Sequence, residues 1–232
     1  MIKFVLYQNN KELCRFNKFN ILTDVIPFKS KIYKNNMYSY YKINYNDIYN
    51  KIYNNELNQN QLNHLLSIKS ILEQSISNNY ESIFILEYDV YFHKKFCKLY
   101  DEYKKLIDNN DIIHMGSSQH RWYNYITNDK VIIKKYNNLE YYNNTQSLGT
   151  FAIILKKVIF RDYLNFINFV LSEHKYFPSD VILSIISQKY KSIVLYPNLI
   201  ICDLNNSNIL QKNRDNDYIK FKWYLNRYQL NL

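Results

Sequence analysis

Two carboxylates follow a short apolar run near the middle of the chain. Residues 82–86 lead directly into Glu87, and Asp89 comes two positions later. The run is β-branched and aromatic, which is typical of a buried strand in a mostly parallel sheet. In an extended chain, residues two apart point the same way, so both carboxylates could face one ligand at the carboxyl edge of the sheet. Such a pair of oxygen ligands suits Mg²⁺ or Mn²⁺ carrying a diphosphate.

A structural role explains the same pattern. Short motifs carry a false-positive risk, because a carboxylate that ends a strand often caps the next turn or pairs with a lysine. The spacing of Glu87 and Asp89 alone therefore leaves a metal site and a structural pair open as alternatives.

Length and composition indicate a single domain over residues 1–232, long enough to bury a substantial core. The chain has 25 Tyr and 13 Phe but only 2 Gly and 3 Pro, a bias typical of an AT-rich genome rather than of a function. The formal net charge of +10 favours an anionic partner such as a nucleotide diphosphate, an acidic glycan or nucleic acid. The lysines are scattered, however, and no known nucleic-acid-binding motif is present.

Cysteine usage and hydropathy favour a cytoplasmic protein. Cys14, Cys97 and Cys202 are odd in number and far apart, which predicts neither a disulfide framework nor a zinc site. The apolar stretch at residues 2–7 is too short for a signal peptide, and no run approaches the length of a membrane span. We therefore expect an intracellular chain in a reducing compartment.

Strand-like and helix-like segments alternate along the chain. Apolar residues spaced three to four apart predict amphipathic helices, and short β-branched runs between them predict strands. This alternation indicates an α/β sheet flanked by helices. Strands are expected near residues 2–7, 24–34, 82–87, 111–116, 131–136, 150–155 and 192–196, and helices near residues 60–78, 96–107, 157–172, 178–190 and 217–229.

Seven short segments are each a weak signal of a family, but their order and spacing along the chain form a much more specific signal. They are residues 57–64 (ending in Asn63-His64), 85–90 (Ile-Leu-Glu-Tyr-Asp-Val), 111–116, 148–154 (opening Leu-Gly-Thr), 178–180 (Pro-Ser-Asp), 196–200 and 207–209. This set resembles glycosyltransferase family 25, the lipooligosaccharide and procollagen galactosyltransferase group. The resemblance covers residues 57–209, whereas residues 1–56 resemble the family poorly.

The resemblance implies a GT-A fold of Rossmann type, a UDP-sugar donor, a divalent cation (Mn²⁺ or Mg²⁺) and a glycan or protein-linked acceptor, with hexose transfer by inversion. Three residues depart from the family pattern, because Tyr88 replaces an acidic residue, Asn63 replaces Ser and Asn208 replaces Asp. Many GT-A enzymes take a third metal ligand, often a histidine, from the C-terminal region. No histidine follows His174 here, so Asp203 is the nearest acidic substitute for that ligand. Metal binding is therefore expected to be weaker than in the family, or absent.

The resemblance also implies residue roles. Asp89 is the best metal ligand, and Glu87 contacts the metal or the donor ribose, so that the ion can neutralise the leaving diphosphate. Asp180, at the start of an expected helix, is the candidate base that takes the proton of the acceptor hydroxyl. Its alternative role is to stabilise the helix N-terminus.

Further contacts to the donor are expected from His64, Gly149 and Thr150, since a glycine lets the backbone approach a sugar closely. A packed or capping histidine and a simple turn are the alternatives. Other side chains could meet phosphate or stack on sugar rings, although solvation and core filling explain them as well. They are His120, Arg121, Trp122, Tyr123, Lys134 and Lys135.

Two rival functions stay open. The same fold could bind sugars or nucleotides, or act as a scaffold, without catalysis, and the substitutions at Tyr88, Asn63 and Asn208 favour that alternative. Alternatively, the basic chain could bind nucleic acid with a steeply salt-dependent affinity. The nucleic-acid hypothesis leaves the buried strand and its carboxylates unexplained.

Overall fold

The computed structural model describes residues 1–18, 21–30, 59–118, 131–143, 147–172, 177–204 and 215–230. The expected phosphate- or sugar-contacting residues 120–123, His174 and the motif at residues 207–209 lie outside these ranges. Residues 57 and 58 of the first family-like segment also lie outside them, but His64 lies within.

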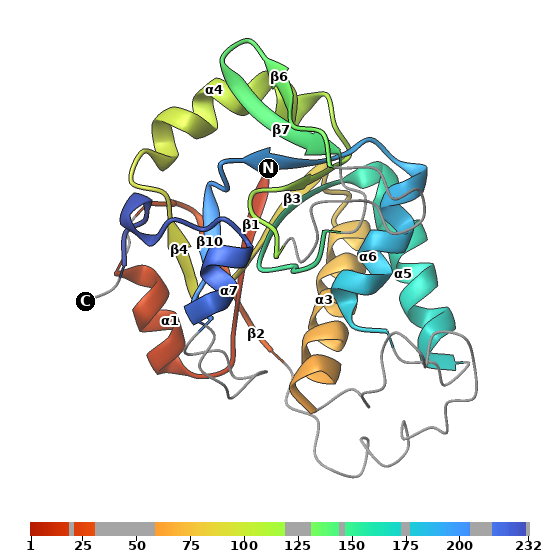
Figure 1. Cartoon of the computed structure of the whole chain (residues 1–232). Coiled ribbons are helices and arrows are strands. Elements are labelled where there is room, and N and C mark those ends of the chain that lie inside the picture. The colour runs from red at the N-terminus through yellow and green to blue at the C-terminus, as the bar shows by residue number, and fades with distance from the viewer. Residues whose placement is uncertain are drawn as a thin grey trace.

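A sheet of eight strands forms the centre of the described part of the chain (Figure 1). Its order is β2-β1-β3-β8-β5-β9-β7-β6, and every strand except β8 and β7 runs in the same direction. The sheet is therefore mostly parallel, and the predicted α/β class, consistent with a Rossmann-like fold, is confirmed. The strands are β1 (Ile2–Tyr7), β2 (Val25–Lys29), β3 (Ser82–Glu87), β5 (Ile112–His114), β6 (Lys134–Tyr136), β7 (Leu139–Asn143), β8 (Ala152–Lys156) and β9 (Ser192–Tyr196).

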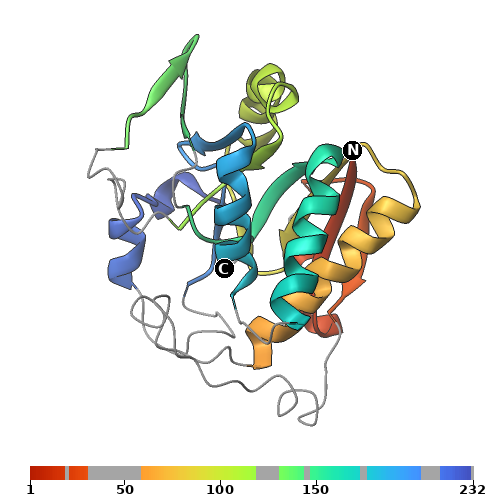
Figure 2. The same cartoon turned by 90° about the vertical axis from the view of Figure 1, so that its right-hand side faces the viewer.

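One face of the sheet is covered by three helices, α3 (Gln59–Ser77), α5 (Lys157–Ser172) and α6 (Ser179–Ile186). Figure 2 shows these helices packed side by side. Alternate residues of β3, Ile83 and Ile85, point into this layer and are fully buried. The helix periodicity and the strand alternation therefore meet in one apolar core, as the sequence pattern requires.

The other face carries α1 (Asn10–Asn17), α4 (Phe96–Asp108) and α7 (Asp215–Lys220), which lie on the opposite side of the sheet in Figure 1. A two-stranded antiparallel ribbon of β4 (Val90–Phe92) and β10 (Ile200–Cys202) belongs to the same layer. The intervening residues of β3, Phe84 and Leu86, are buried in this second core. Strand β3 is thus buried on both sides, as its continuous apolar run predicts.

Most expected elements are present, with a few differences. The expected tail helix at 217–229 is short, because α7 ends at Lys220 and only a single 3₁₀ turn follows at Leu225–Arg227. The ribbon strands β4 and β10, strand β7 and helix α1 were not expected. Three-residue strands and a helix of eight residues are too short to give a clear periodicity.

A local signal for α1 does exist. The Asn9 side chain accepts hydrogen bonds from the backbone N–H groups of Lys11 and Glu12. In return, the Glu12 carboxylate accepts from the Gln8 backbone N–H and from the Asn9 side-chain amide. This reciprocal pattern resembles a capping box, with Asn9 as the N-cap and with Gln8 rather than Asn9 donating its backbone N–H to Glu12, and it starts the helix that carries Arg15.

No helix within the described ranges combines the length and the apolar character that crossing a bilayer requires.

Candidate functional site

The chain leaves the large sheet directly after β3. At the end of β3, the Glu87 backbone N–H donates to the Phe151 carbonyl at 2.8 Å, and Glu87 pairs with Leu6 of β1. Tyr88 and Asp89 form a turn, and Val90 begins the two-stranded ribbon. The two carboxylates predicted from the sequence therefore flank the point where the chain passes from one sheet to the other.

Glu87 pairs with a histidine from the helical layer. Its Oε1 lies 3.2 Å from Nε2 of His64, and the other ring nitrogen, Nδ1, lies 2.8 Å from Oγ of Ser179 at the start of α6. Burial lowers the pKa of His64, but the negative charges of Glu87 and Asp180 outweigh that effect and leave the pKa raised. Since 22% of the Glu87 side chain stays exposed, a ligand can reach this pair.

Asp180 lies in the first turn of α6, near the Glu87–His64 pair. Its Oδ2 accepts a hydrogen bond from the Gly149 backbone N–H at 3.1 Å, and its Oδ1 accepts from the Val181 N–H at 2.9 Å. Burial raises the pKa of Asp180, although these two N–H donors and His64 oppose the shift. The carboxylate thus has a fixed orientation and a strengthened basicity, and it also serves the N-terminus of its helix.

The loop before β8 joins these residues from another direction. Gly149 has a φ of 93°, and a Cβ there would lie 2.7 Å from the Phe151 ring. Thr150 is buried, with its Oγ1 3.3 Å from Oγ of Ser179. The glycine is therefore required by the backbone conformation that turns its N–H toward Asp180, whether or not a sugar lies against it.

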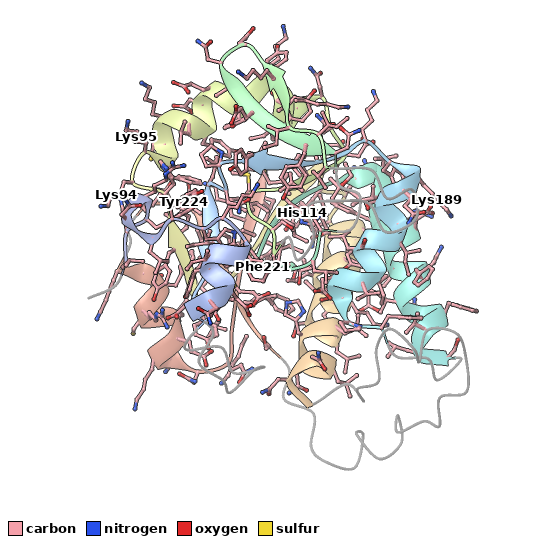
Figure 3. The ribbon with its side chains drawn as sticks, viewed as in Figure 1. Lys94, Lys95, His114, Lys189, Phe221 and Tyr224 are labelled. Carbon is pink, nitrogen blue, oxygen red and sulfur yellow. The ribbon has the colours of Figure 1, made fainter. Side chains whose placement is uncertain are left out.

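His114, at the end of β5, is a buried residue of this region for which sequence reasoning assigned no role (Figure 3). Burial lowers the pKa of His114 to about 4, with a hydrogen bond to the Gly149 backbone opposing the shift. The side chain is therefore neutral at physiological pH. Its position at the carboxyl end of an expected strand was a usable signal.

Asp89 lies in a different environment from Glu87. Only 6% of the residue is exposed, and its Oδ1 has no hydrogen-bond partner within the described residues. Burial, and then the negative charge of Glu87, raise the pKa of Asp89 well above the ordinary carboxyl value. An unpaired buried carboxylate oxygen is costly to keep, which is typical of a group whose partner arrives from outside.

Asp203 approaches Asp89 along the backbone, because its N–H donates to the Asp89 carbonyl at 2.7 Å. Its side chain is engaged by the protein. Oδ2 of Asp203 accepts from Nη2 of Arg15 at 2.5 Å and from the Tyr91 hydroxyl at 2.7 Å. Sequence reasoning missed Arg15 and Tyr91, since 188 and 112 positions separate them from Asp203.

The described residues could supply only part of the coordination shell of a divalent ion. Among the described residues, no group of three or more His, Cys, Asp or Glu side chains could hold a metal ion. Mg²⁺ and ions like it are, however, often bound by one or two carboxylates while phosphate and water oxygens complete the shell. The unpaired Oδ1 of Asp89 suits that mode, and Asp203 is less suited because Arg15 already occupies its Oδ2.

The comparison with known families shows the class of protein to which this chain belongs. Residues 9–176 match glycosyltransferase family 25 (LPS biosynthesis protein). The chain therefore belongs to glycosyltransferase family 25. The match begins well upstream of residue 57, so the expectation that residues 1–56 resemble the family poorly was wrong for most of that segment. Asp180 lies just beyond the matched residues.

Other comparisons add little. None of the curated proteins compared with this chain matches it. The solved structure entitled "Crystal Structure of A197 from STIV" is similar at 11% identity and a TM-score of 0.37, with 92% of this chain and 98% of that chain covered. That likeness is too distant to inform the fold or the function.

Proposed function

We propose that this glycosyltransferase moves a hexose from a UDP-sugar to a hydroxyl group of a glycan or of a protein-linked acceptor, with inversion, on a GT-A-type fold formed by residues 1–232. The observation that carries the proposal is the convergence of Glu87, His64 and Asp180 from β3, α3 and α6. These side chains come from separate parts of a family 25 chain and influence one another electrostatically.

The donor diphosphate would lie near the turn after β3. Asp89 and Glu87 would hold a divalent cation there, with Asp89 contributing its unpaired Oδ1. When bound, Mn²⁺ or Mg²⁺ supplies positive charge that neutralises the departing diphosphate. Glu87 is kept in place by His64, whose raised pKa favours the imidazolium that pairs with a carboxylate.

Asp180 would act as the base. In a single displacement, the acceptor oxygen attacks the anomeric carbon, the bond from that carbon to the diphosphate breaks, and the hydroxyl proton passes to a carboxylate oxygen of Asp180. A carboxyl whose pKa is raised accepts that proton more readily than an ordinary one. The hydrogen bonds from Gly149 and Val181 keep the group oriented for it.

The test is a donor panel of UDP-sugars with Mn²⁺, read as hydrolysis and as transfer. We expect Asp180→Asn to lose turnover by about 10²–10⁴-fold while still binding UDP. Asp101→Asn, an exposed change of the same kind on α4, should leave turnover unchanged. Full turnover by Asp180→Asn would contradict the role of the base, and UDP binding without turnover on any donor would favour a binding protein.

A further inference from the structure

Arg15 lies on α1, in the layer that also contains the β4–β10 ribbon. Its guanidinium reaches across to Asp203 and Tyr91, and its charge acts on Asp89 as well. About 24% of the Arg15 side chain is exposed, whereas Asp203 is 3% exposed. The arginine is therefore partly exposed to solvent while it lies beside two buried carboxylates, Asp203 and Asp89.

The guanidinium is held by one of its nitrogens. Both hydrogen bonds of Arg15 within the described residues use Nη2, which donates to Asp203 Oδ2 and, at 3.2 Å, to the Tyr91 hydroxyl. The Tyr91 ring lies beneath the group, with Cζ of Arg15 5.7 Å from the ring centroid. A guanidinium has five N–H donors in a rigid planar fork, so the donors on Nε and Nη1 stay available while the group is fixed.

Two buried carboxylates, Asp203 and Asp89, lie close to Arg15. Asp203 shares its Oδ2 with Arg15 and Tyr91, but Oδ1 of the neighbouring Asp89 has no partner in the described part of the chain. A cation held by Asp89 and Glu87 would therefore stand beside the guanidinium. Two fixed positive groups at one place fit an anion with two negative centres.

We propose that Arg15 binds the donor diphosphate directly, oriented by Asp203 and Tyr91, and so supplies a permanent positive charge beside the divalent ion. This inference rests on the proposed function, because it assumes a nucleotide-diphosphate donor. Its consequence is that part of the affinity for the diphosphate survives when divalent ions are removed. A planar fork matches phosphate oxygens in a way that a lysine ammonium does not.

The test is calorimetric binding of UDP and of uridine to the full chain, with Mn²⁺ and with EDTA. We expect Arg15→Lys to weaken UDP binding about tenfold in Mn²⁺ and to abolish the residual binding in EDTA, because the single ammonium stays on Asp203. Uridine binding should not change, since it lacks the diphosphate. Arg161→Lys, the same change at an exposed position of α5, is the matched control and should behave like the wild type.

Each outcome decides the inference. Equal UDP affinity in the wild type and Arg15→Lys would overturn the role of Arg15 and leave the proposed function intact. Equal losses for UDP and uridine, together with a lower unfolding temperature, would assign Arg15 a purely structural role and also overturn it. If the wild type binds no UDP under either condition, the proposed function fails first, and this inference fails with it.

Discussion

At the scale of single residues, Asp180 has two properties that a general base needs. Its carboxylate is held in a fixed orientation, and its pKa is raised. A base acts only when deprotonated, so turnover should be present above its pKa and fall as the pH drops through it. Because burial raises that pKa, we expect the acid limb of kcat/KM to lie above the ordinary aspartate value of about 3.9. A pH–rate profile measures it, and a limb at or below that value would contradict the assignment.

The buried Asp89 carboxylate is expected to cost stability in the folded chain. Its pKa is raised, which means that the folded protein disfavours the charged form, and its Oδ1 has no partner among the described residues. The isosteric change Asp89→Asn removes the charge and should raise the free energy of unfolding at neutral pH by about 1–2 kcal/mol. Nucleotide binding in Mn²⁺ should weaken at the same time.

Thermal unfolding and UDP calorimetry on the same Asp89→Asn sample measure both effects. The exposed change Asp101→Asn on α4 should move neither quantity. A lower unfolding temperature for Asp89→Asn would show that the charge is needed to hold the turn, and would argue against a site kept for an external cation.

At the scale of elements, helix α1 is capped by the side chain of Asn9. Replacing Asn9 by alanine leaves the N–H groups of Lys11 and Glu12 without their side-chain acceptor. We expect Asn9→Ala to lower the free energy of unfolding by about 1 kcal/mol. Denaturant unfolding measures this, with Asn10→Ala at the exposed first position of the helix as control, and equal effects of the two changes would contradict the cap.

The segment after β5 approaches the ribbon more closely at Gly116 than any side chain permits. A Cβ on Gly116 would lie 1.7 Å from the carbonyl oxygen of Ile200, a backbone atom of β10 that cannot rotate away. We expect Gly116→Ala to cost about 3 kcal/mol or more, or to prevent folding. Gly149→Ala should cost less, because its obstacle is the Phe151 ring, although its positive φ adds strain. Soluble yield and thermal unfolding rank the two, and the reverse order would contradict the close approach.

For the whole molecule, a ligand that binds only the folded chain must stabilise it. At a UDP concentration of 100 times its dissociation constant in Mn²⁺, the free energy of unfolding should rise by about 2.7 kcal/mol, or roughly 5–10 °C in Tm for a chain of this size. Uridine at the same concentration is the control, and its effect should be much smaller if the diphosphate supplies most of the affinity. Identical shifts would contradict a diphosphate site.

The net charge of +10 is a second property of the whole molecule. It steers any anion and therefore does not by itself separate a nucleotide sugar from nucleic acid.

The sequence by itself determined the local features of this protein. The apolar run before Glu87 specified a strand buried on both faces, and the spacing of apolar residues specified α3, α4 and α5. These patterns are readable because a strand or a helix repeats its side-chain directions within a few residues. The order of short motifs likewise indicated the family to which residues 9–176 belong.

Only the tertiary structure decided which side chains meet. Strand alternation predicts that Glu87 and Asp89 face one ligand. In the structure β3 ends at Glu87, so the following turn, rather than strand alternation, sets Asp89 within reach of the charges of Glu87, Asp203 and Arg15. His64 reaches Glu87 only because α3 packs against the sheet. Such contacts join residues that are distant in the chain, and they follow from the packing of layers, which no short-range periodicity encodes.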